Sequence, residues 1–480
     1  MRNASPHWHS MVLILVSVVW AAPSTRAIAD DRPVALVGAT IIDGTGAEPV
    51  PNGVVVVKNG RFLAVGSSRT VTVPAGATRI DATGKYVIPG LMDANVHLFL
   101  DIETEPLIKY EGHYDDLIIE AAQIALRNGV TTVFDTWGPR EALVRARTRI
   151  NSGEAIGSRI FIAGNIIGFD GPFSDDFFQA GYLGAEFARE VNDEWEQGVG
   201  GDLLWRTPDE VRARIRQYIE NGHVDFLKYG SSGHQQEQYI AFSPEAQRAI
   251  VEEGHKAGLI VQSHSTSVES LRLAIAAGVD LMQHCETTGI EPMPASTLKS
   301  IVEGHIPCAA MLKTARYMAW TSTHEYRKNF SEISRIEQEN DHALIDARAV
   351  LLLTTDSGVW RPEAASNPQL SSFLKDVPDM PTQLENAQFL WLRAAGELGL
   401  SPMAALLAGT RNIAAAYGRL NDLGTIERGK KADLVVLDAD PLQNPENYRA
   451  IHLVMKDGAV VDRNRIPTRH HLTHDAAPNR

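Results

Sequence analysis

Short apolar runs alternate with helix-like patterns through the central part of the chain, from about residue 89 to residue 418. This alternation is typical of a parallel α/β sheet, in which each strand is followed by a helix that crosses back over the sheet. Eight of the runs are strand-like, and they end near His97, Asp135, Ala163, Lys228, His264, His284, Ala310 and Asp356. Eight such units predict a (β/α)8, TIM-like barrel, whose active site lies at the carboxyl ends of the strands.

Helix-start signals support this division of the chain. Thr207 is followed by Pro208 and Glu210, the pattern of a capping box with proline in the first turn. Ser-Pro pairs at 243–244 and 401–402 open helical patterns in a similar way.

The two ends of the chain have a different, β-rich pattern. Near the start, Asn-Gly pairs at 52–53 and 59–60 separate short strand-like runs. Both residue types tolerate positive φ, so we expect a turn at each pair. Two further strand-like runs lie near the end of the chain, at residues 433–438 and 452–462.

Residues able to bind metal ions stand at the carboxyl ends of the expected barrel strands. Asn95 and His97 are two positions apart, so on a strand both point to the same face. Later runs end in Lys228, His264, His284 and Asp356. Any one of them could be a satisfied polar group of the core. Their occurrence together at successive strand ends favours a metal site.

This order of residues resembles the amidohydrolase superfamily of metal-dependent hydrolases, and within it the imidazolonepropionase-like and prolidase-like branches. Segments 80–85 and 423–438 carry the same resemblance, which covers nearly the whole chain after residue 30. It implies that residues 30–88 and 419–465 pair into one small composite β-sandwich beside a barrel of residues 89–418. Asn95 departs from the pattern, because it stands where the family has the first His of His-x-His. Some phenylurea and thiocarbamate hydrolases are similar in this respect.

The resemblance also implies a binuclear centre of two divalent metal ions, with zinc as the expected metal. His97 and Asp356 match the ligands of the first ion. Asn95, at the vacated His position, offers only a neutral amide oxygen, so this site is expected to be weak. His264 and His284 match the ligands of the second ion.

Lys228 matches the residue that bridges the two ions. A buried lysine has a lowered pKa, and its amine can then react with carbon dioxide to give a carbamate, which bridges metals as a carboxylate does. The neighbours Phe226 and Leu227 favour burial over a surface position. Asp356 matches the residue that takes a proton from the bridging water and passes it to the leaving group. Lys228 and Asp356 are therefore the expected catalytic residues.

Three long connections follow the first, third and eighth strands and are expected to wall a substrate pocket: residues 98–114, 165–206 and 357–381. Trp137, Phe169, Tyr229 and His234 are candidate substrate-binding residues on this side of the barrel. A lone aromatic residue or histidine on a loop is more often a packing residue. Tyr229 and His234 are preferred as contacts because they follow Lys228 closely.

We therefore expect a hydrolase that cleaves a C–N bond in an amide, dipeptide, N-acyl amino acid, carbamate or urea, with hydroxide activated by the metal ions. Two alternatives stay open. Superfamily deaminases resemble one another in a His-x-x-Glu on strand five, whereas here Ser267 stands at the Glu position after His264. A metal-binding protein with a degraded active site is suggested by Asn95 and opposed by the other five ligand positions.

Composition and the N-terminal segment give predictions about the binding partners and the location of the protein. The chain has 480 residues and a formal net charge of -14, which opposes nonspecific binding to nucleic acid. We expect a small-molecule, amide-type substrate and a homo-oligomer. Residues 1–29 predict a secretory signal peptide, with Arg2, an apolar run and small residues at 27 and 29. The protein would then be exported to the periplasm or the medium and keep no stable membrane anchor; a retained N-terminal anchor is the alternative.

The remaining features are minor. The chain has only two cysteines, Cys285 and Cys308, which excludes a disulfide framework. We expect both to be small buried residues, with one disulfide between them as the alternative. Residues 466–480 form a polar tail that we expect to fray.

Overall fold

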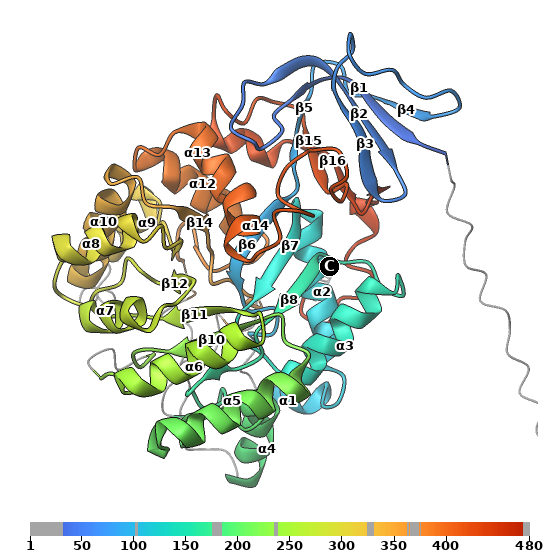
Figure 1. The fold of residues 1–480 in the computed structure, drawn as a ribbon. Coiled ribbons are helices and arrows are strands. Elements are labelled where there is room, and N and C mark those ends of the chain that lie inside the picture. Colours follow the sequence, from blue (N-terminus) through green and yellow to red (C-terminus); the bar gives the residue numbers. More distant parts are fainter. Residues whose placement is uncertain are drawn as a thin grey trace, which may run out of the picture.

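The structure is a computed structural model, and it describes residues 32–100, 104–174, 185–234, 239–323, 331–361, 364, 374 and 376–473. Figure 1 shows parallel strands with their helices, and a separate mixed sheet at one end, drawn in blue and red. The expected signal peptide, residues 1–29, lies outside the described residues. Within the described ranges, no helix is both long enough and apolar enough to cross a membrane.

The mixed sheet is built from both ends of the chain. Its strands are β1 (Val34–Ile41), β2 (Val50–Lys58), β3 (Arg61–Ser67), β4 (Thr78–Asp81), β5 (Tyr86–Pro89), β15 (Leu434–Leu437), β16 (Ile451–Lys456) and β17 (Ala459–Val460). Their order is β17-β16-β15-β5-β1-β2-β3, with β4 paired to β1. Antiparallel pairing of β5 with β15 joins the two ends of the chain. Apolar side chains from both ends share a small core, which includes Leu36, Phe62 and Leu434.

One of the two expected Asn-Gly turns is present. Asn59 and Gly60, with φ angles of 53° and 74°, connect β2 to β3. The expected turn at Asn52 and Gly53 is wrong, because both residues lie inside β2. Asn52 does have a positive φ of 49°, and the pairing of β1 with β2 shifts register around Gly53. The positive φ of Asn52 therefore belongs to a bulge-like irregularity inside β2 and not to a turn between two strands.

The central strands are parallel, and every expected strand is present. One sheet has the order β6-β7-β8 and the other β14-β13-β12-β11-β10-β9. The bounds are β6 (Leu91–Val96), β7 (Val130–Asp135), β8 (Arg159–Ile162), β9 (Ile166–Ile167), β10 (Phe226–Gly230), β11 (Ile260–His264), β12 (Leu281–Gln283), β13 (Cys308–Ala310) and β14 (Leu351–Leu353). Most end at or next to the expected residue; β10 continues past Lys228, and β14 ends before Asp356.

Backbone hydrogen bonds join the two parallel sheets on both sides. The N–H of Asp356 donates to the carbonyl of Asn95 over 2.9 Å, and the N–H of His97 donates to the carbonyl of Ser357 over 2.8 Å. The end of β6 is thereby fixed beside the chain that follows β14. On the other side, the N–H of Asp225 donates to the carbonyl of Ile162 over 2.8 Å, which links β8 to the start of β10.

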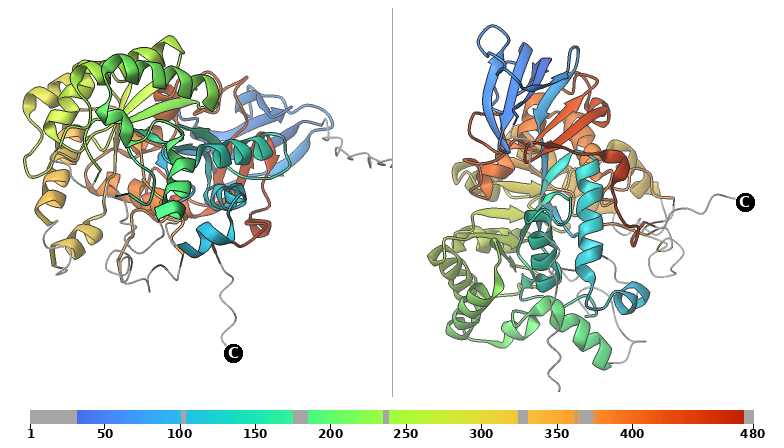
Figure 2. Two further views of the ribbon diagram at one scale, coloured as in Figure 1. Left: turned by 90° about the horizontal axis from the view of Figure 1, so that it is seen from below. Right: turned by 90° about the vertical axis from the view of Figure 1, so that its right-hand side faces the viewer.

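Helices follow the parallel strands and cover their outer side, as the two views of Figure 2 show. They are α1 (Thr104–Lys109), α2 (Tyr114–Arg127), α3 (Arg140–Asn151), α4 (Ala185–Glu196), η1 (Gly201–Trp205), α5 (Pro208–Gly222), α6 (Pro244–Lys256), α7 (Val268–Ala277), α8 (Ala295–Glu303), α9 (Ala315–Thr323), α10 (Ser331–Asp346), α12 (Ala387–Glu397), α13 (Pro402–Ala408) and α14 (Arg411–Ala416). Two short 3-10 helices belong to the mixed-sheet part of the chain: η4 (Pro445–Arg449) precedes β16 and η5 (Arg463–Arg465) follows β17. The expected helix starts are confirmed: Thr207 and Glu210 form a capping box at α5, and Ser243 and Ser401 cap α6 and α13.

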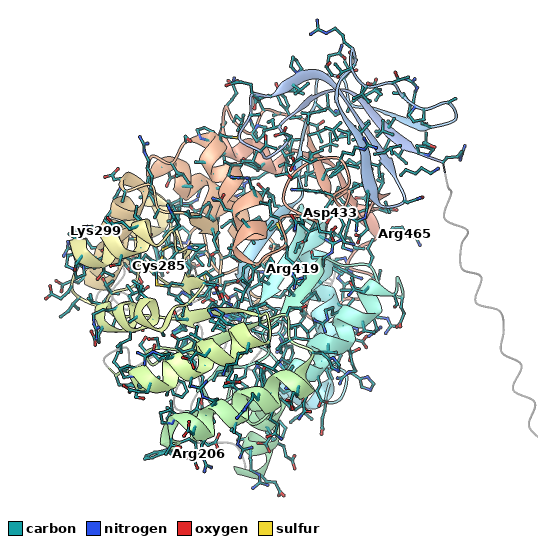
Figure 3. The ribbon with its side chains drawn as sticks, in the orientation of Figure 1. Arg206, Cys285, Lys299, Arg419, Asp433 and Arg465 are labelled. Atoms are coloured by element: carbon teal, nitrogen blue, oxygen red, sulfur yellow. The ribbon has the colours of Figure 1, made fainter. Side chains whose placement is uncertain are left out.

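A cluster of ion pairs connects the mixed sheet to the parallel strands. Arg159, at the start of β8, donates to Oδ2 of Asp433 over 2.5 Å and also to Asp457. Asp433 precedes β15 and Asp457 follows β16. Figure 3 labels Asp433 where the two parts of the molecule meet. Because Arg159 and Asp433 are both buried, the pair fixes this junction through charge as well as through packing.

The end of the described chain is more ordered than expected. The carboxylate of Glu120 on α2 accepts hydrogen bonds from the backbone N–H groups of His471, Leu472 and Thr473, at 2.6, 2.7 and 3.0 Å. The expectation of a frayed tail is therefore wrong for residues 466–473, and residues 474–480 lie outside the described ranges. Cys285 and Cys308 are buried free thiols, as expected.

Candidate active site

The six residues that the sequence singled out as ligands meet at the carboxyl ends of the parallel strands. β6 contributes Asn95 and, directly after it, His97, while β10 contributes Lys228. The others stand at or just after the ends of β11, β12 and β14: His264, His284 and Asp356. All except Asp356 are buried, and Asp356 is half-buried.

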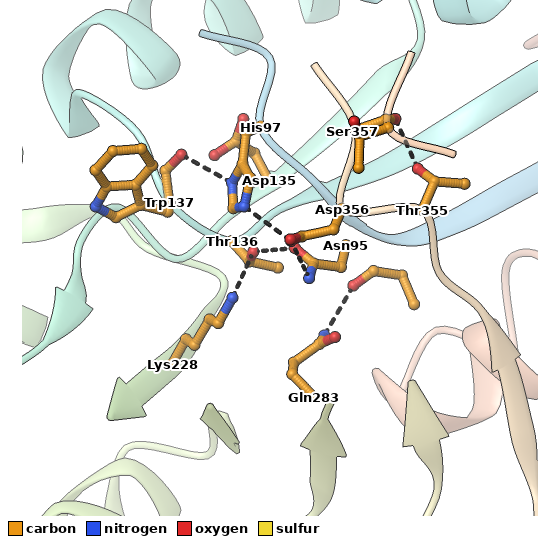
Figure 4. Close-up of polar contacts among 12 residues, drawn as sticks. Asn95, His97, Asp135, Thr136, Trp137, Lys228, Gln283, Thr355, Asp356 and Ser357 are labelled. Atoms are coloured by element: carbon orange, nitrogen blue, oxygen red, sulfur yellow. Dashed lines mark hydrogen bonds and ion pairs between the residues drawn. The ribbon is translucent and has the colours of Figure 1, made fainter. Parts of the chain in front are cut away.

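Asp356 is the centre of one half of this cluster. Its Oδ1 accepts a hydrogen bond from Nδ2 of Asn95 over 2.7 Å and lies 2.9 Å from Nε2 of His97 (Figure 4). Burial alone would raise the pKa of Asp356, but the neighbouring His97 and His284 outweigh it and hold that pKa well below its usual range. Asp356 is therefore a carboxylate at neutral pH.

His97 is oriented by a backbone group. Its Nδ1 lies 3.3 Å from the carbonyl oxygen of Trp137. A carbonyl only accepts, so Nδ1 carries the proton in this contact, and Nε2 is the ring nitrogen that faces Asp356. Metal-ligating histidines are commonly held in this way, with the second ring nitrogen donating to a backbone carbonyl.

His264 and His284 form the other half. Their rings lie 4.7 Å apart at an angle of 67°. Neither ring nitrogen of the buried His264 has a hydrogen-bond partner. Burial is the main cause that lowers the pKa of both rings, to about 3 for His284, so both are neutral at pH 7. A buried imidazole with two unpaired nitrogens is costly unless it binds something else, and a neutral imidazole is the form that binds metal ions.

Lys228 lies between the two halves. Burial lowers its pKa to about 8, against the opposite effect of Asp356 and Asp135. Its Nζ donates to Oγ1 of Thr136 over 3.0 Å. Burial therefore makes the uncharged amine, which is the form that reacts with carbon dioxide, more abundant near neutral pH than it is for an exposed lysine.

Two of these residues have unusual backbone geometry. Asp356 and His284 have φ angles of 51° and 58°, in the left-handed region. That region costs a residue other than glycine about 1–2 kcal/mol. Such conformations cluster at functional sites, where the surrounding structure holds a side chain in a required direction. The residue before Asp356 is held in place as well: the N–H and hydroxyl of Thr355 donate to the carboxylate of the buried Asp93, at 3.2 and 2.6 Å.

Thr136 and Asp135 are site residues that the sequence analysis missed. The hydroxyl of Thr136 donates to Oδ1 of Asn95. Oδ2 of Asp135 accepts from the N–H of Leu98 over 2.8 Å, and burial raises the pKa of Asp135 to about 7. The signal that could have found both is their position: they stand at the end of β7, like the other site residues on their strands.

Three of the four candidate substrate-binding residues adjoin the cluster. The ring centroid of Trp137 lies 5.7 Å from that of His97. Phe169 and His234 lie 5.3 and 5.6 Å from His264. Parts of the long connections around them lie outside the described residues.

Tyr229 is not brought to the site. It follows Lys228 on β10, so its side chain points to the opposite face of the strand. Its hydroxyl donates to Oε1 of Gln247 on α6 over 3.0 Å. The interpretation of Tyr229 as a substrate contact is therefore corrected: it packs between the sheet and its covering helix.

A large cavity between described residues lies apart from the candidate ligands. It has a volume of about 1440 Å³ and lies at the junction with the mixed sheet, beside Arg159, Arg419 and Asp457. Arg159 begins β8, so this cavity lies on the amino side of the parallel strands, whereas active sites of TIM-barrel enzymes lie at the carboxyl ends. We place the candidate site by its chemistry, at the carboxyl ends.

When only His, Cys, Asp and Glu side chains are counted, the described part of the chain holds no group of three or more placed to bind a metal ion. The candidate set is not limited to these residue types, since it includes Lys228 and Asn95. The unpaired nitrogens of His264 and the orientation of His97 by Trp137 fit a metal centre at this place.

Comparison with known proteins identifies the family. The sequence matches the Amidohydrolase family over residues 86–461, and the chain belongs to it. The fold is similar to that of a molinate hydrolase, with 37% identity, a TM-score of 0.87 and coverage of 94% of this chain and 99% of that one. It is also similar to phenylurea hydrolase B, with 35% identity, a TM-score of 0.85 and coverage of 92% and 100%. Ochratoxinase from Aspergillus niger is 22% identical over 457 residues, 91% of this chain and 88% of its own.

Family membership confirms the resemblance inferred from the sequence. The chain is a hydrolase that acts on carbon–nitrogen bonds. The family implies a TIM-barrel fold, which agrees with the parallel α/β arrangement described above. The superfamily generally uses a binuclear metal centre.

Proposed function

We propose that this chain is an exported, metal-dependent amidohydrolase of small amide-type substrates. The main support is the group of His264, His284 and Lys228: His264 has two unpaired ring nitrogens, His284 is neutral, and the Lys228 amine is largely desolvated. A buried imidazole without hydrogen bonds, beside a second neutral imidazole and a buried amine, supports a metal site rather than a purely structural role. The similarity to phenylurea hydrolase B supports urea-type substrates within the amide class, and the similarity to molinate hydrolase supports a small-molecule substrate.

The residues divide into two ligand sets in this proposal. His97 and Asp356 hold a first divalent ion, with Asn95 beside them, and His264 and His284 hold a second. Lys228 joins the sets after its amine has reacted with carbon dioxide to give a carbamate. When bound, two zinc-like ions lower the pKa of a water molecule and polarise the substrate carbonyl.

The remaining chemistry falls to the side chains. Asp356 is the only carboxyl group among the six residues, and because its pKa lies below the usual range it is ionised and has an oxygen free to take a proton. It takes the proton of the attacking water and returns it to the leaving nitrogen. Asn95 and His97 hold its Oδ1 in place. Trp137 and Phe169 give the substrate an apolar wall, and His234 offers a polar contact beside it.

The proposal extends to the architecture and the location of the protein. We propose that the two parallel sheets close into a (β/α)8 barrel of residues 89–418. Residues 30–88 and 419–465 form the composite β-sandwich, and the chain assembles as a homo-oligomer. Residues 1–29 act as a signal peptide, and the mature protein works in the periplasm or outside the cell. N-terminal sequencing of the exported protein tests this: it is expected to begin at Asp30, and a chain that begins at Met1 would refute it.

A substrate screen with metal analysis tests the activity. Purified protein is offered aryl ureas, thiocarbamates, N-acyl amino acids and dipeptides, with and without chelator. We expect hydrolysis of at least one class, loss of it with chelator, and loss of it in Lys228→Ala. Lys256→Ala, which removes an exposed lysine of α6, is the matched control. Hydrolysis that survives complete removal of divalent metal would overturn the proposal.

A further inference from the structure

The hydroxyl of Thr136 lies between two residues of the candidate metal centre. Thr136 follows β7 directly, and its N–H donates to the carbonyl of Val96 over 3.1 Å, which fixes it beside the end of β6. Its Oγ1 accepts from Nζ of Lys228 over 3.0 Å and donates to Oδ1 of Asn95. Thr136, Asn95 and Lys228 are all buried, so water does not compete for these bonds.

The donor and acceptor roles in this chain of bonds follow from the groups themselves. Nζ of Lys228 carries hydrogens and is the donor to Thr136. A hydroxyl has one hydrogen, so Thr136 passes its own to the carbonyl oxygen of the Asn95 amide. The amide nitrogen then faces Asp356 and donates to its Oδ1 over 2.7 Å. The chain runs in one direction, from Lys228 through Thr136 and Asn95 to Asp356 (Figure 4).

We propose that Thr136 is a positioning residue that fixes the orientation of the Asn95 amide. It holds the amide oxygen on its own hydroxyl and thereby keeps the amide nitrogen on Asp356. Asn95 therefore acts as a hydrogen-bond donor to the catalytic carboxylate, not as a ligand. The inference rests on the proposed function and deepens it: the first metal site lacks a ligand because the bonds to Thr136 and Asp356 together fix the direction in which the Asn95 amide faces.

Removal of the hydroxyl reverses this arrangement. In Thr136→Val the Asn95 amide has no donor for its oxygen and is free to turn that oxygen toward the first metal ion. The amide oxygen would then be available to that ion as a ligand. Lys228 also loses an acceptor in this variant, which changes metal binding for a separate reason. A test must therefore isolate the part of the effect that passes through Asn95.

A double-mutant cycle isolates that part. The four proteins are wild type, Thr136→Val, Asn95→Ala and the double variant, each loaded with zinc and carbon dioxide. The readout is zinc per chain against chelator concentration, which does not depend on activity. Thr136→Val removes the acceptor of Lys228 whether residue 95 is Asn or Ala. The change in zinc retention that passes through Lys228 is therefore the same in both cases and cancels in the comparison. In each background, the effect of Thr136→Val is the factor by which it raises the chelator concentration that removes the labile ion. We expect this factor to be about fivefold larger with Asn95 than in the Asn95→Ala background, because about fivefold corresponds to the free energy of one hydrogen bond.

Two further variants guard the interpretation. Thr136→Ser keeps the hydroxyl and is expected to behave as wild type. Thr131→Val removes another buried hydroxyl near the amino end of the same strand, far from the cluster, and is expected to leave zinc retention unchanged. An equal effect of Thr136→Val in both backgrounds overturns this inference alone. A wild-type protein that retains no divalent metal overturns the proposed function and this inference with it.

Discussion

Nδ2 of Asn95 donates to Oδ1 of Asp356 over 2.7 Å. Asn95 is the residue that departs from the family pattern, and Asp356 is the carboxylate proposed to move the proton. The departure thus changes more than the number of metal ligands, because it also places a hydrogen-bond donor on the proton acceptor. The same oxygen lies 2.9 Å from Nε2 of His97, so two side chains from one strand hold it.

Asn95→His is expected to tighten the weak metal site. The imidazole restores a nitrogen ligand on the same face of β6, and nitrogen is a better donor to zinc-like ions than a neutral amide. The chelator concentration that removes the labile ion should rise by about tenfold. The measurement is metal per chain against chelator for both proteins. If the wild type loses both ions together and the variant behaves identically, Asn95 has no part in the metal site.

Lys228→Ala is expected to lower kcat/KM by at least about 100-fold. Loss of a residue that only supports a metal ligand lowers activity by up to about 100-fold, and a bridging ligand should matter at least as much. Short carboxylic acids should restore part of the activity, because a free carboxylate fits the space left by the carbamate. Lys228→Arg should stay inactive with or without acid, since the guanidinium remains positively charged. Unchanged activity in Lys228→Ala without added acid would rule out a bridging role for this residue.

The strands and most of the site could be predicted because both follow from local signals. Apolar runs such as the one before His264 mark buried parallel strands, and the carboxyl ends of such strands meet on one side of the sheet. These two signals were enough to predict that four of the candidate ligands lie close together: His97, Lys228, His264 and His284. Asp356 lies beyond the end of β14, and its placement depends on the backbone bonds with Asn95 and Ser357 that the sequence does not show.

The misjudged residues have separate physical causes. Thr136 was missed because its role depends on the register of β6 against β7, in which Val96 pairs with Asp135. Tyr229 was misplaced although the signal was present: the two-residue period that turns Lys228 inward turns its neighbour outward. Asn52 has the positive φ that Asn-Gly predicts, but the sequence does not distinguish a bulge from a turn.

Asp356→Asn is expected to lower kcat by about 10²–10⁴-fold, the range for loss of general acid–base catalysis. Asparagine keeps the size of the side chain but cannot accept the proton of the attacking water. The measurement is kcat and KM on the best substrate of the screen, with metal content determined in parallel. Asp209→Asn, at an exposed position in the first turn of α5, is the control. A variant with its metal intact and wild-type kcat would show that Asp356 does not move the proton.

The junction between the mixed sheet and the parallel strands gives a prediction about stability. Burial alone would raise the pKa of Asp457, but Arg159, Lys456 and Lys431 outweigh it and hold that pKa below its usual range. Asp457→Asn removes one partner of the buried Arg159, and the side chain of Asp457 is 41% exposed, so solvent weakens the pair. We expect a loss of about 1 kcal/mol at pH 7, seen as a lower melting temperature.

The sign of the pH dependence follows from the direction of the shift. A carboxylate whose pKa is lower in the folded than in the unfolded protein stabilises the fold above the unfolded value, which is about 4, and this contribution is lost as the pH falls through the folded value. The difference in melting temperature between wild type and Asp457→Asn should therefore be constant from pH 8 to about pH 5 and shrink below about pH 4. Glu303→Gln, which removes an exposed ion pair with Lys299, should change stability by less than about 0.5 kcal/mol. A difference that grows in acid would mean that Asp457 does not stabilise the junction as a carboxylate.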